Sequence, residues 1–221
     1  MPGDGSGSRS NRKRWPLGLA LCSLVGLVAL GTQTVANELR DRGRRRKTRS
    51  ALCEIASAAQ RYFADVGCLP ADPGQLERDP GPSVPGWSGP YLGQQAGPFV
   101  DAWSCPIQWF VSNDLLSLRS AGGDARFGDG GDVTVLLHAD RIRAQITLER
   151  LRRLNEGIVI YNAAFQLTEP LVPDCKALVR QLADKGLVGQ GEDLTRDAWG
   201  LPFVADPAGL APVVRMRSVR L

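Results

Sequence analysis

The chain has 221 residues, of which 43% are hydrophobic and 23% charged, so it is long enough to bury one or two small cores. Its net charge of +4 is unevenly divided, because residues 1–50 hold 11 basic and 3 acidic side chains and the remainder holds 16 basic and 20 acidic ones. The main part of the chain is therefore slightly acidic, which argues against nucleic-acid binding. Five cysteines without a Cys-x-x-Cys pair, and a single histidine, argue against a zinc site.

The chain begins with a Gly-, Ser- and Arg-rich stretch, residues 1–14, which we expect to be disordered. No charged residue lies between Arg14 and Glu38, and this is about the twenty residues that a helix needs to cross a bilayer. We therefore predict a transmembrane helix at residues 15–37. The alternative is a cleaved signal peptide with its peptidase site near Ala36, since a basic start precedes the apolar run.

The charges around this segment leave its orientation open. Four basic residues precede it, and seven follow it before residue 50. The positive-inside tendency alone would keep the following domain in the cytoplasm. The basic cluster after the segment is typical of attraction to anionic lipid headgroups, and a solvated basic linker is the alternative.

A second helix is predicted within residues 37–66, which lack proline and carry apolar residues at helical spacing. It can continue the membrane helix as one long rod. The proline- and glycine-rich residues 67–97 exclude long regular structure. Strands are predicted at residues 107–111, 115–118 and 133–138, with a tight hairpin between the first two.

One hexapeptide occurs twice. Asp-Ala-Trp-Ser-Cys-Pro at residues 101–106 returns as Asp-Ala-Trp-Gly-Leu-Pro at residues 197–202. A helical stretch with a tyrosine, Tyr62 or Tyr161, precedes each copy, and an apolar strand ending in Arg-Ser follows each. We therefore predict a unit of roughly a hundred residues that is used twice.

The second copy is predicted to begin with a helix at residues 139–167. A shorter helix at residues 175–185 ends at Gly186, a residue typical of helix C-termini. Strands near residues 201–205 and 213–219 complete this copy. The first copy differs, because it continues beyond its second strand into a loop rich in glycine and aspartate.

The predicted fold class is thus α+β: an N-terminal membrane helix runs into a long helix packed on a small antiparallel sheet, and a second, degenerate copy of the helix-plus-sheet unit follows. The predicted boundaries place the first domain at residues 38–138 and the second at residues 139–221. We expect the tryptophan of each repeated turn, Trp103 or Trp199, to anchor the core of its copy.

The order of the motifs resembles the major pseudopilin of type II secretion. After the long N-terminal helix come Gly-Pro-Tyr-Leu at residues 89–92, the Asp-Ala-Trp turn at 101–106, a hairpin, and the Ser/Gly/Asp-rich residues 120–132. The resemblance covers residues 45–137 well and residues 141–221 in part. It implies a subunit that assembles through its N-terminal helix.

The resemblance also implies a calcium ion in the loop. Carried over to this chain, the carboxylates of Asp124, Asp129 and Asp132 would bind it, with Ser120 and the carbonyl of Ala121 as further ligands. Calcium takes six to eight oxygens from a flexible loop, and the glycines of this segment allow a tight fold around an ion. A solvated Gly/Asp turn without an ion is the alternative.

The chain departs from the family at its start, because residues 15–20 carry neither the leader-peptidase motif nor its glutamate. The resemblance therefore does not extend to processing by the prepilin peptidase. It implies a structural or accessory subunit of a type II secretion or pilus-like system, single-pass in the bacterial inner membrane with periplasmic domains. Its partners would be other pseudopilin or secretion-system subunits, and it would bind no small-molecule substrate.

Two other classes of function stay open. An anchored ligand-binding or adhesion module of the envelope would use an exposed aromatic surface. Its candidate residues are Trp87, Tyr91, Trp103 and Trp109. An enzyme is disfavoured, because His138 is the only histidine and the chain has no nucleophile elbow, zinc-protease motif or phosphate loop.

The cysteines outside the apolar segment suggest one pairing. Cys68 ends the first amphipathic helix and Cys105 lies in the first repeated turn, so a disulfide between them is possible in an oxidising compartment. Cys53 and Cys175 have no evident partner. Buried free thiols are the alternative for all four.

Overall fold

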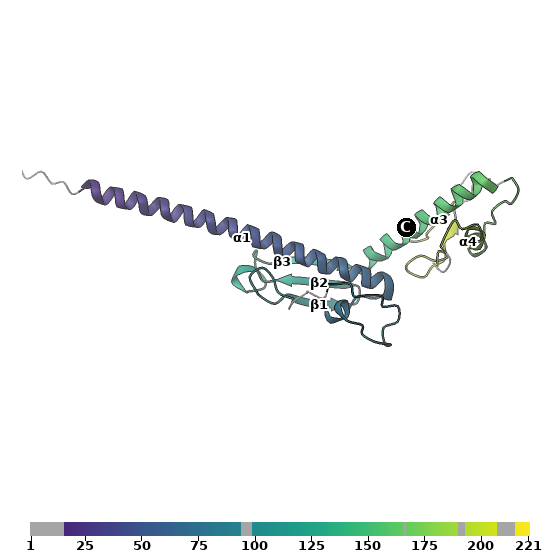
Figure 1. Cartoon of the computed structure of the whole chain (residues 1–221), viewed down its shortest axis with the longest axis horizontal. Coiled ribbons are helices and arrows are strands. Elements are labelled where there is room, and N and C mark those ends of the chain that lie inside the picture. Colours follow the sequence, from purple (N-terminus) through teal and green to yellow (C-terminus); the bar gives the residue numbers. More distant parts are fainter. Residues whose placement is uncertain (1–15, 94–98, 166, 190–192, 207–214) are drawn as a thin grey trace, which may run out of the picture.

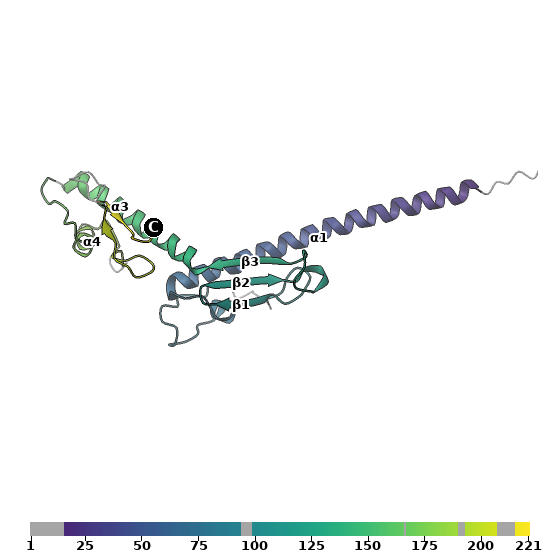
Figure 2. The same ribbon diagram turned by 180° about the vertical axis from the view of Figure 1, so that it is seen from behind.

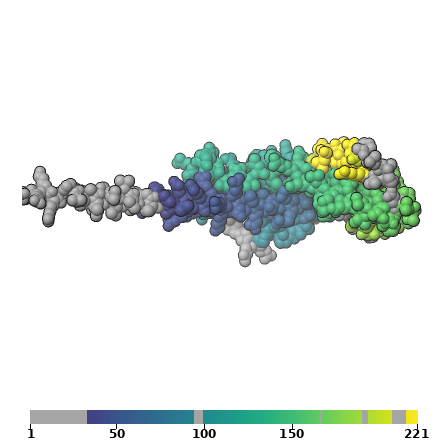
Figure 3. Space-filling view, turned by 90° about the horizontal axis from the view of Figure 1, so that it is seen from above, coloured from purple at the N-terminus to yellow at the C-terminus, as the bar shows by residue number. Residues whose placement is uncertain are grey.

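The computed structural model describes residues 16–93, 99–165, 167–189, 193–206 and 215–221, with side chains from residue 33 onward. It is an α+β protein with a long helix and a small antiparallel sheet, as predicted. Figure 1 shows α1 as a rod with the sheet beside its C-terminal half, and Figure 2 shows the same arrangement from behind. Viewed from above, the residues from α3 onward form the end of the molecule away from the N-terminus (Figure 3).

Helix α1 (Pro16–Val66) is continuous over 51 residues, which confirms the predicted rod. It ends at Gly67, whose φ of 84° is the left-handed conformation common after helices and whose N–H donates to the Phe63 carbonyl at 2.8 Å. In the part of the chain that the structure describes, no helix has both the length and the apolar character to cross a membrane. The predicted tail and the side chains of most of the predicted transmembrane segment lie outside the described residues.

The sheet has three antiparallel strands in the order β1-β2-β3: β1 (Gln108–Ser112), β2 (Leu115–Ser120) and β3 (Val133–His138). All three predicted strands are confirmed within two residues. Asn113 and Asp114 make the hairpin, with Asn113 at φ 43°, a conformation that asparagine tolerates better than most residues.

The first core lies between α1 and the inner face of this sheet. Helix α1 presents Leu52, Ile55, Ala59 and Tyr62, a stripe at helical spacing that is at most 7% exposed. It packs against Leu116 and Leu118 of β2 and Val133 and Leu137 of β3. The loop after α1 contributes a short helix, α2 (Gly74–Glu77), whose Leu76 is fully buried in the same core. The predicted absence of long regular structure in this loop is therefore confirmed.

The rest of the chain forms two helices and a second, smaller sheet. These elements are α3 (Ala139–Phe165), α4 (Cys175–Asp184), β4 (Val204–Ala205) and β5 (Met216–Arg217). A second core joins them, made of Leu154, Ile158, Tyr161, Leu178, Leu182, Phe203 and Met216. Both helices end close to their predicted ends, and Gly186 has the expected positive φ of 70°.

The two strands near the C-terminus are shorter than predicted. They pair over two residues only, Val204 with Arg217 and Ala205 with Met216. The N–H of Leu201 is bonded to a carboxylate in the preceding turn and Pro202 has no N–H, so the strand cannot start at residue 201. Residues 213 and 214 of the second predicted strand lie outside the described residues.

Candidate functional site

The first repeated turn is organised by a buried carboxylate. Asp101 is 6% exposed, and its Oδ1 accepts hydrogen bonds from the N–H groups of Trp103 and Cys105, both at 2.9 Å. Its Oδ2 accepts from Ser120 Oγ at 2.6 Å. Because Ser120 is the last residue of β2, the aspartate joins the turn to the sheet. A buried carboxylate with three donors has its charge well satisfied.

The second repeated turn has the same set of bonds. Asp197 is 2% exposed, and its Oδ1 accepts from the N–H groups of Trp199 at 3.0 Å and Leu201 at 2.8 Å. Its Oδ2 accepts from Ser218 Oγ at 2.9 Å. The Arg-Ser pair after each predicted strand thus supplies a hydroxyl to the aspartate of its own turn.

A buried threonine ties each turn to the helix before it. Thr48 of α1 is 1% exposed and accepts from the Ala102 N–H at 3.1 Å. Thr147 of α3 is fully buried and accepts from the Ala198 N–H at 3.0 Å. Sequence reasoning missed both threonines, since a single threonine in a helix is no signal by itself. The two become visible only when the halves are aligned on Tyr62 and Tyr161, because each threonine precedes its tyrosine by the same interval.

The tryptophans of the repeated turns are not core anchors, contrary to the prediction. Trp103 and Trp199 are half-buried and lie outside both cores. Trp199 donates through Nε1 to Asp140 at 3.1 Å, and the guanidinium of Arg220 lies 5.4 Å from its ring. The reason is the turn geometry. The aspartate carboxylate points inward, and the tryptophan two residues later is left at the surface. The aromatic residue that precedes each turn is the buried one: Tyr161 is fully buried, Tyr62 is 1% exposed, and burial raises the pKa of Tyr62 to about 12.

The Gly/Asp loop follows Ser120 directly. It contains one turn of 3-10 helix, Gly122–Asp124. At Gly122 φ is 71°, and a side-chain Cβ there would lie 2.7 Å from the carbonyl oxygen of Gly131. Only glycine therefore fits where the two ends of the loop meet.

Each predicted carboxylate ligand is already bonded within the loop. Asp124 accepts from the Arg126 N–H at 3.2 Å, and Asp129 accepts from the Gly131 N–H at 2.6 Å. Asp132 Oδ2 accepts from Arg119 at 2.8 Å and from the Gly128 N–H at 2.9 Å. These hydrogen bonds hold the loop closed without an ion. The carboxylate oxygens that they do not use remain available to a cation.

The fit of these residues to calcium is partial. Asp124 and Asp129 lie together, and the interaction with the Asp129 side chain, followed by the Arg126 N–H, lowers the pKa of Asp124. Asp132 Oδ1 is buried and has no hydrogen-bond partner among the described residues, so this oxygen could bind a cation. Against this, Ser120 Oγ is bonded to Asp101, so the hydroxyl predicted as a ligand serves the turn.

The remaining predicted ligand, Ala121, is 3% exposed at the end of β2. Within the described residues, no three Asp, Glu, His or Cys side chains converge closely enough to hold a metal ion. The structure therefore brings together two of the predicted carboxylates and holds the third, Asp132, against Arg119.

The four aromatic residues of the adhesion hypothesis do not form an exposed surface. Tyr91 is 8% exposed, and its hydroxyl donates to Asp65 at 2.8 Å. Trp87 and Trp109 are half-buried and pack against the first core, where Trp87 donates through Nε1 to the Gln75 carbonyl at 2.9 Å. Trp103, also half-buried, lies apart from that core. Trp87 and Tyr91 hold the loop after α1 in place.

The four cysteines outside the apolar segment are free thiols. Cys68 and Cys105 are therefore not paired in this structure. Cys53 and Cys68 are exposed, contrary to the buried alternative, because they lie on the outer side and beyond the end of α1. Cys175 is half-buried, and burial raises its pKa to about 11, which makes it a poor nucleophile at neutral pH. His138 ends β3 as an exposed residue.

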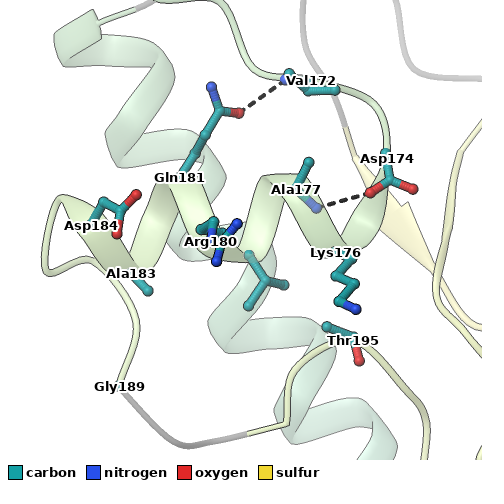
Figure 4. Close-up of a pocket in the computed structure, with 11 residues that line it drawn as sticks. Val172, Asp174, Lys176, Ala177, Arg180, Gln181, Ala183, Asp184, Gly189 and Thr195 are labelled. Atoms are coloured by element: carbon teal, nitrogen blue, oxygen red, sulfur yellow. Dashed lines mark hydrogen bonds between the residues drawn. The ribbon is translucent and has the colours of Figure 1, made fainter.

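A hollow of about 710 Å³ lies beside α4 (Figure 4). Its two hydrogen bonds are structural: Asp174 caps α4 by accepting from the Ala177 N–H at 2.9 Å, and Gln181 accepts from the Val172 N–H at 3.1 Å. The other labelled polar side chains, such as Lys176 and Asp184, do not converge on one point. Together these features account for the local fold of α4.

No protein-family model, curated protein or solved structure shows significant similarity to this chain.

Proposed function

We propose that the protein is a non-enzymatic, pseudopilin-like structural subunit of a type II secretion or pilus-like system. Residues 15–37 would anchor it in the bacterial inner membrane, with the described domains in the periplasm. Its partners would be other pseudopilin or secretion-system subunits. The supporting observation is helix α1, which extends far beyond the sheet that packs on it (Figure 1).

The extended part of α1 is mostly exposed within the described residues, and Arg45 near its end donates to the Gly130 carbonyl at 3.4 Å. From residue 33 to residue 47, every residue except the half-buried Asp41 is exposed. Ion pairs between Arg42 and Glu38 at 3.7 Å and between Arg45 and Asp41 at 3.0 Å run along this surface. Exposed pairs of this kind stabilise a helix only slightly, by about 0.3–0.5 kcal/mol each. A long, largely exposed helix that extends beyond its own sheet is suited to contact neighbouring subunits.

We also propose that the chain is a duplicated module. The identical bonding of Asp101 and Asp197, of Ser120 and Ser218, and of Thr48 and Thr147 supports this proposal. The first unit is then α1 with the β1-β2-β3 sheet, and the second unit is α3 with α4 and the β4-β5 sheet. The first unit alone carries the Gly/Asp loop and β3.

Association through α1 is tested by cysteine cross-linking of the full chain in membranes. In a background without the five native cysteines, Val35→Cys, at a position 58% exposed on α1, should form disulfide-linked dimers on oxidation. Leu136→Cys, at a position 53% exposed on the outer face of the sheet, is the matched control. Equal cross-linking at both positions, or none at Val35→Cys, would contradict assembly through the helix.

We propose that the Gly/Asp loop binds calcium through Asp124 and Asp129, with Oδ1 of Asp132 joining them when the ion binds. Calcium at a hundred times its dissociation constant should stabilise the first unit by about 2.7 kcal/mol, measured as a rise in melting temperature of the full chain over its value in chelator. The double variant Asp124→Ala/Asp129→Ala should lose this rise and melt as the wild type does in chelator. An unchanged melting temperature in calcium would reduce the loop to a self-bonded turn.

A further inference from the structure

One edge of the second sheet faces a groove. In the described part of the chain, β5 pairs with β4 and with no other strand. Its opposite edge faces α3, and a groove of about 980 Å³ lies between them. Leu148, Asn155 and Val159 of α3 and Met216 of β5 are among the residues that line it.

In the first unit, a strand occupies the corresponding place. β2 pairs with β1 on one edge and with β3 on the other, and Leu118 of β2 lies opposite Val135 of β3. β3 also packs against α1, burying Val133 and Leu137 in the first core. The first unit thus shows what fills the space between the helix and the second strand of such a sheet: a strand with apolar residues at alternate positions.

In the second unit, the side-chain amide of Asn155 makes the hydrogen bonds that such a strand would make. Its Nδ2 donates to the Met216 carbonyl at 3.1 Å, and its Oδ1 accepts from the Met216 N–H at 2.9 Å. One donor and one acceptor are what the peptide groups of an adjacent strand would offer to this residue. The matching position of α1, 99 residues earlier, is Ala56, which leaves room for β3.

The groove is more apolar than the fold of the unit requires. Leu148 is 56% exposed and Val159 is 63% exposed. At the matching positions of α1, the first unit has Arg49 and Gln60. Because both apolar side chains are more than half exposed, they contribute little buried area to the folded unit. Exposed apolar side chains beside a strand edge that no further strand of the described chain covers indicate a surface that a partner covers.

We propose that this groove binds an extended segment of another protein, which adds to β5 as a third strand in the place that β3 takes beside β2. The segment would carry apolar residues at alternate positions facing α3, and its backbone would replace the Asn155 amide at Met216. This is recognition by strand addition, in which main-chain bonds hold the segment and side-chain pockets select it. The inference rests on the proposed correspondence of the two units and is independent of the membrane anchor and of calcium.

The test uses a labelled peptide with the sequence of residues 131–140, which contains β3, and the full chain. Binding is measured by fluorescence anisotropy against a control peptide in which Val133, Val135 and Leu137 are replaced by serine. We expect the β3 peptide to bind at least about tenfold more tightly than the control. Hydrogen exchange at the Met216 amide should stay slow in the complex of an Asn155→Ala variant, where the peptide takes over the lost bond.

Two variants that carry the residues of the matching positions of α1 test whether the peptide binds in this groove. Asn155→Ala, which introduces the residue of α1, should strengthen binding because the strand edge is free. The double variant Leu148→Arg/Val159→Gln, also copied from α1, should weaken binding at least about tenfold while its melting temperature stays within a few degrees of wild type.

Three outcomes would overturn the inference. The control peptide would bind as well as the β3 peptide, or the double variant would bind as well as the wild type. Alternatively, the chain would self-associate through the groove, seen as dimers that the double variant abolishes, which would make the occupant a second copy. Loss of α1 cross-linking or of the calcium effect would leave this result unchanged, so failures of the two proposals are distinguishable.

Discussion

Replacing Asp101 by alanine should destabilise the first unit by about 3 to 5 kcal/mol. The substitution removes the acceptor for two backbone N–H groups and for Ser120 Oγ, and both Asp101 and Ser120 are buried. A buried donor without a partner costs its full desolvation free energy, about 1 to 3 kcal/mol each. The loss would be measured as the free energy of unfolding in urea, followed by hydrogen exchange of the β2 amides.

Two controls make this result specific. Glu54→Ala removes an exposed carboxylate from α1, which belongs to the same unit as Asp101, and should change the free energy of unfolding by less than about 0.5 kcal/mol. Asp197→Ala removes the matching carboxylate of the second unit and should accelerate exchange in that unit while the β2 amides stay protected. An Asp101→Ala protein as stable as Glu54→Ala would show that the repeated turn does not depend on its aspartate.

The repeated hexapeptide predicted where the two turns lie and misassigned the residue that matters in them. Tryptophan is the larger apolar side chain, so sequence reasoning placed Trp103 and Trp199 in the cores. The structure buries the aspartates instead, because a carboxylate that accepts two N–H groups of its own turn must point into that turn. Which side chain of a turn faces inward depends on backbone geometry, and a motif alone does not give this geometry.

The helices and strands were predictable where the residue pattern of the segment itself determines them. The helical spacing of the α1 and α3 apolar residues, and the short apolar runs of β1, β2 and β3, are properties of each segment alone. The lengths of β4 and β5 depend on a partner strand and on bonds made by the preceding turn, so the sequence overestimated them. Asn155 shows the same limit, since its role exists only once α3 and β5 are side by side.

The residues of the Gly/Asp loop were predictable only in part, because some of their partners lie outside the loop. Glycine and aspartate in alternation indicate a tight, acidic turn, and Asp124 and Asp129 do lie together. The spacing could not reveal that Arg119 holds Asp132 or that Ser120 is taken by Asp101, because these partners come from the strand and from the repeated turn. The partial fit to calcium follows from these tertiary contacts.

Replacing Tyr161 by alanine should unfold the second unit and leave the first intact. Tyr161 is fully buried, its ring lies 5.2 Å from that of Phe165, and its hydroxyl donates to Glu169 at 3.4 Å. Loss of a buried aromatic side chain costs about 3 to 5 kcal/mol, and the second core is small, with seven buried residues among those that the structure describes. The expected result is fast hydrogen exchange throughout α4 with β2 amides still protected.

Ile160, next to Tyr161, supplies the control, and binding of the β3 peptide supplies a functional measurement. Ile160→Ala, at a position 53% exposed, should leave exchange in α4 slow. Tyr161→Ala should abolish binding of the β3 peptide, because the groove needs a folded β5, whereas Tyr62→Ala should disrupt the first core and leave that binding intact. If Tyr161→Ala instead released the β2 amides together with α4, the two cores would form one cooperative structure, and strand addition at the second could not be independent of the first.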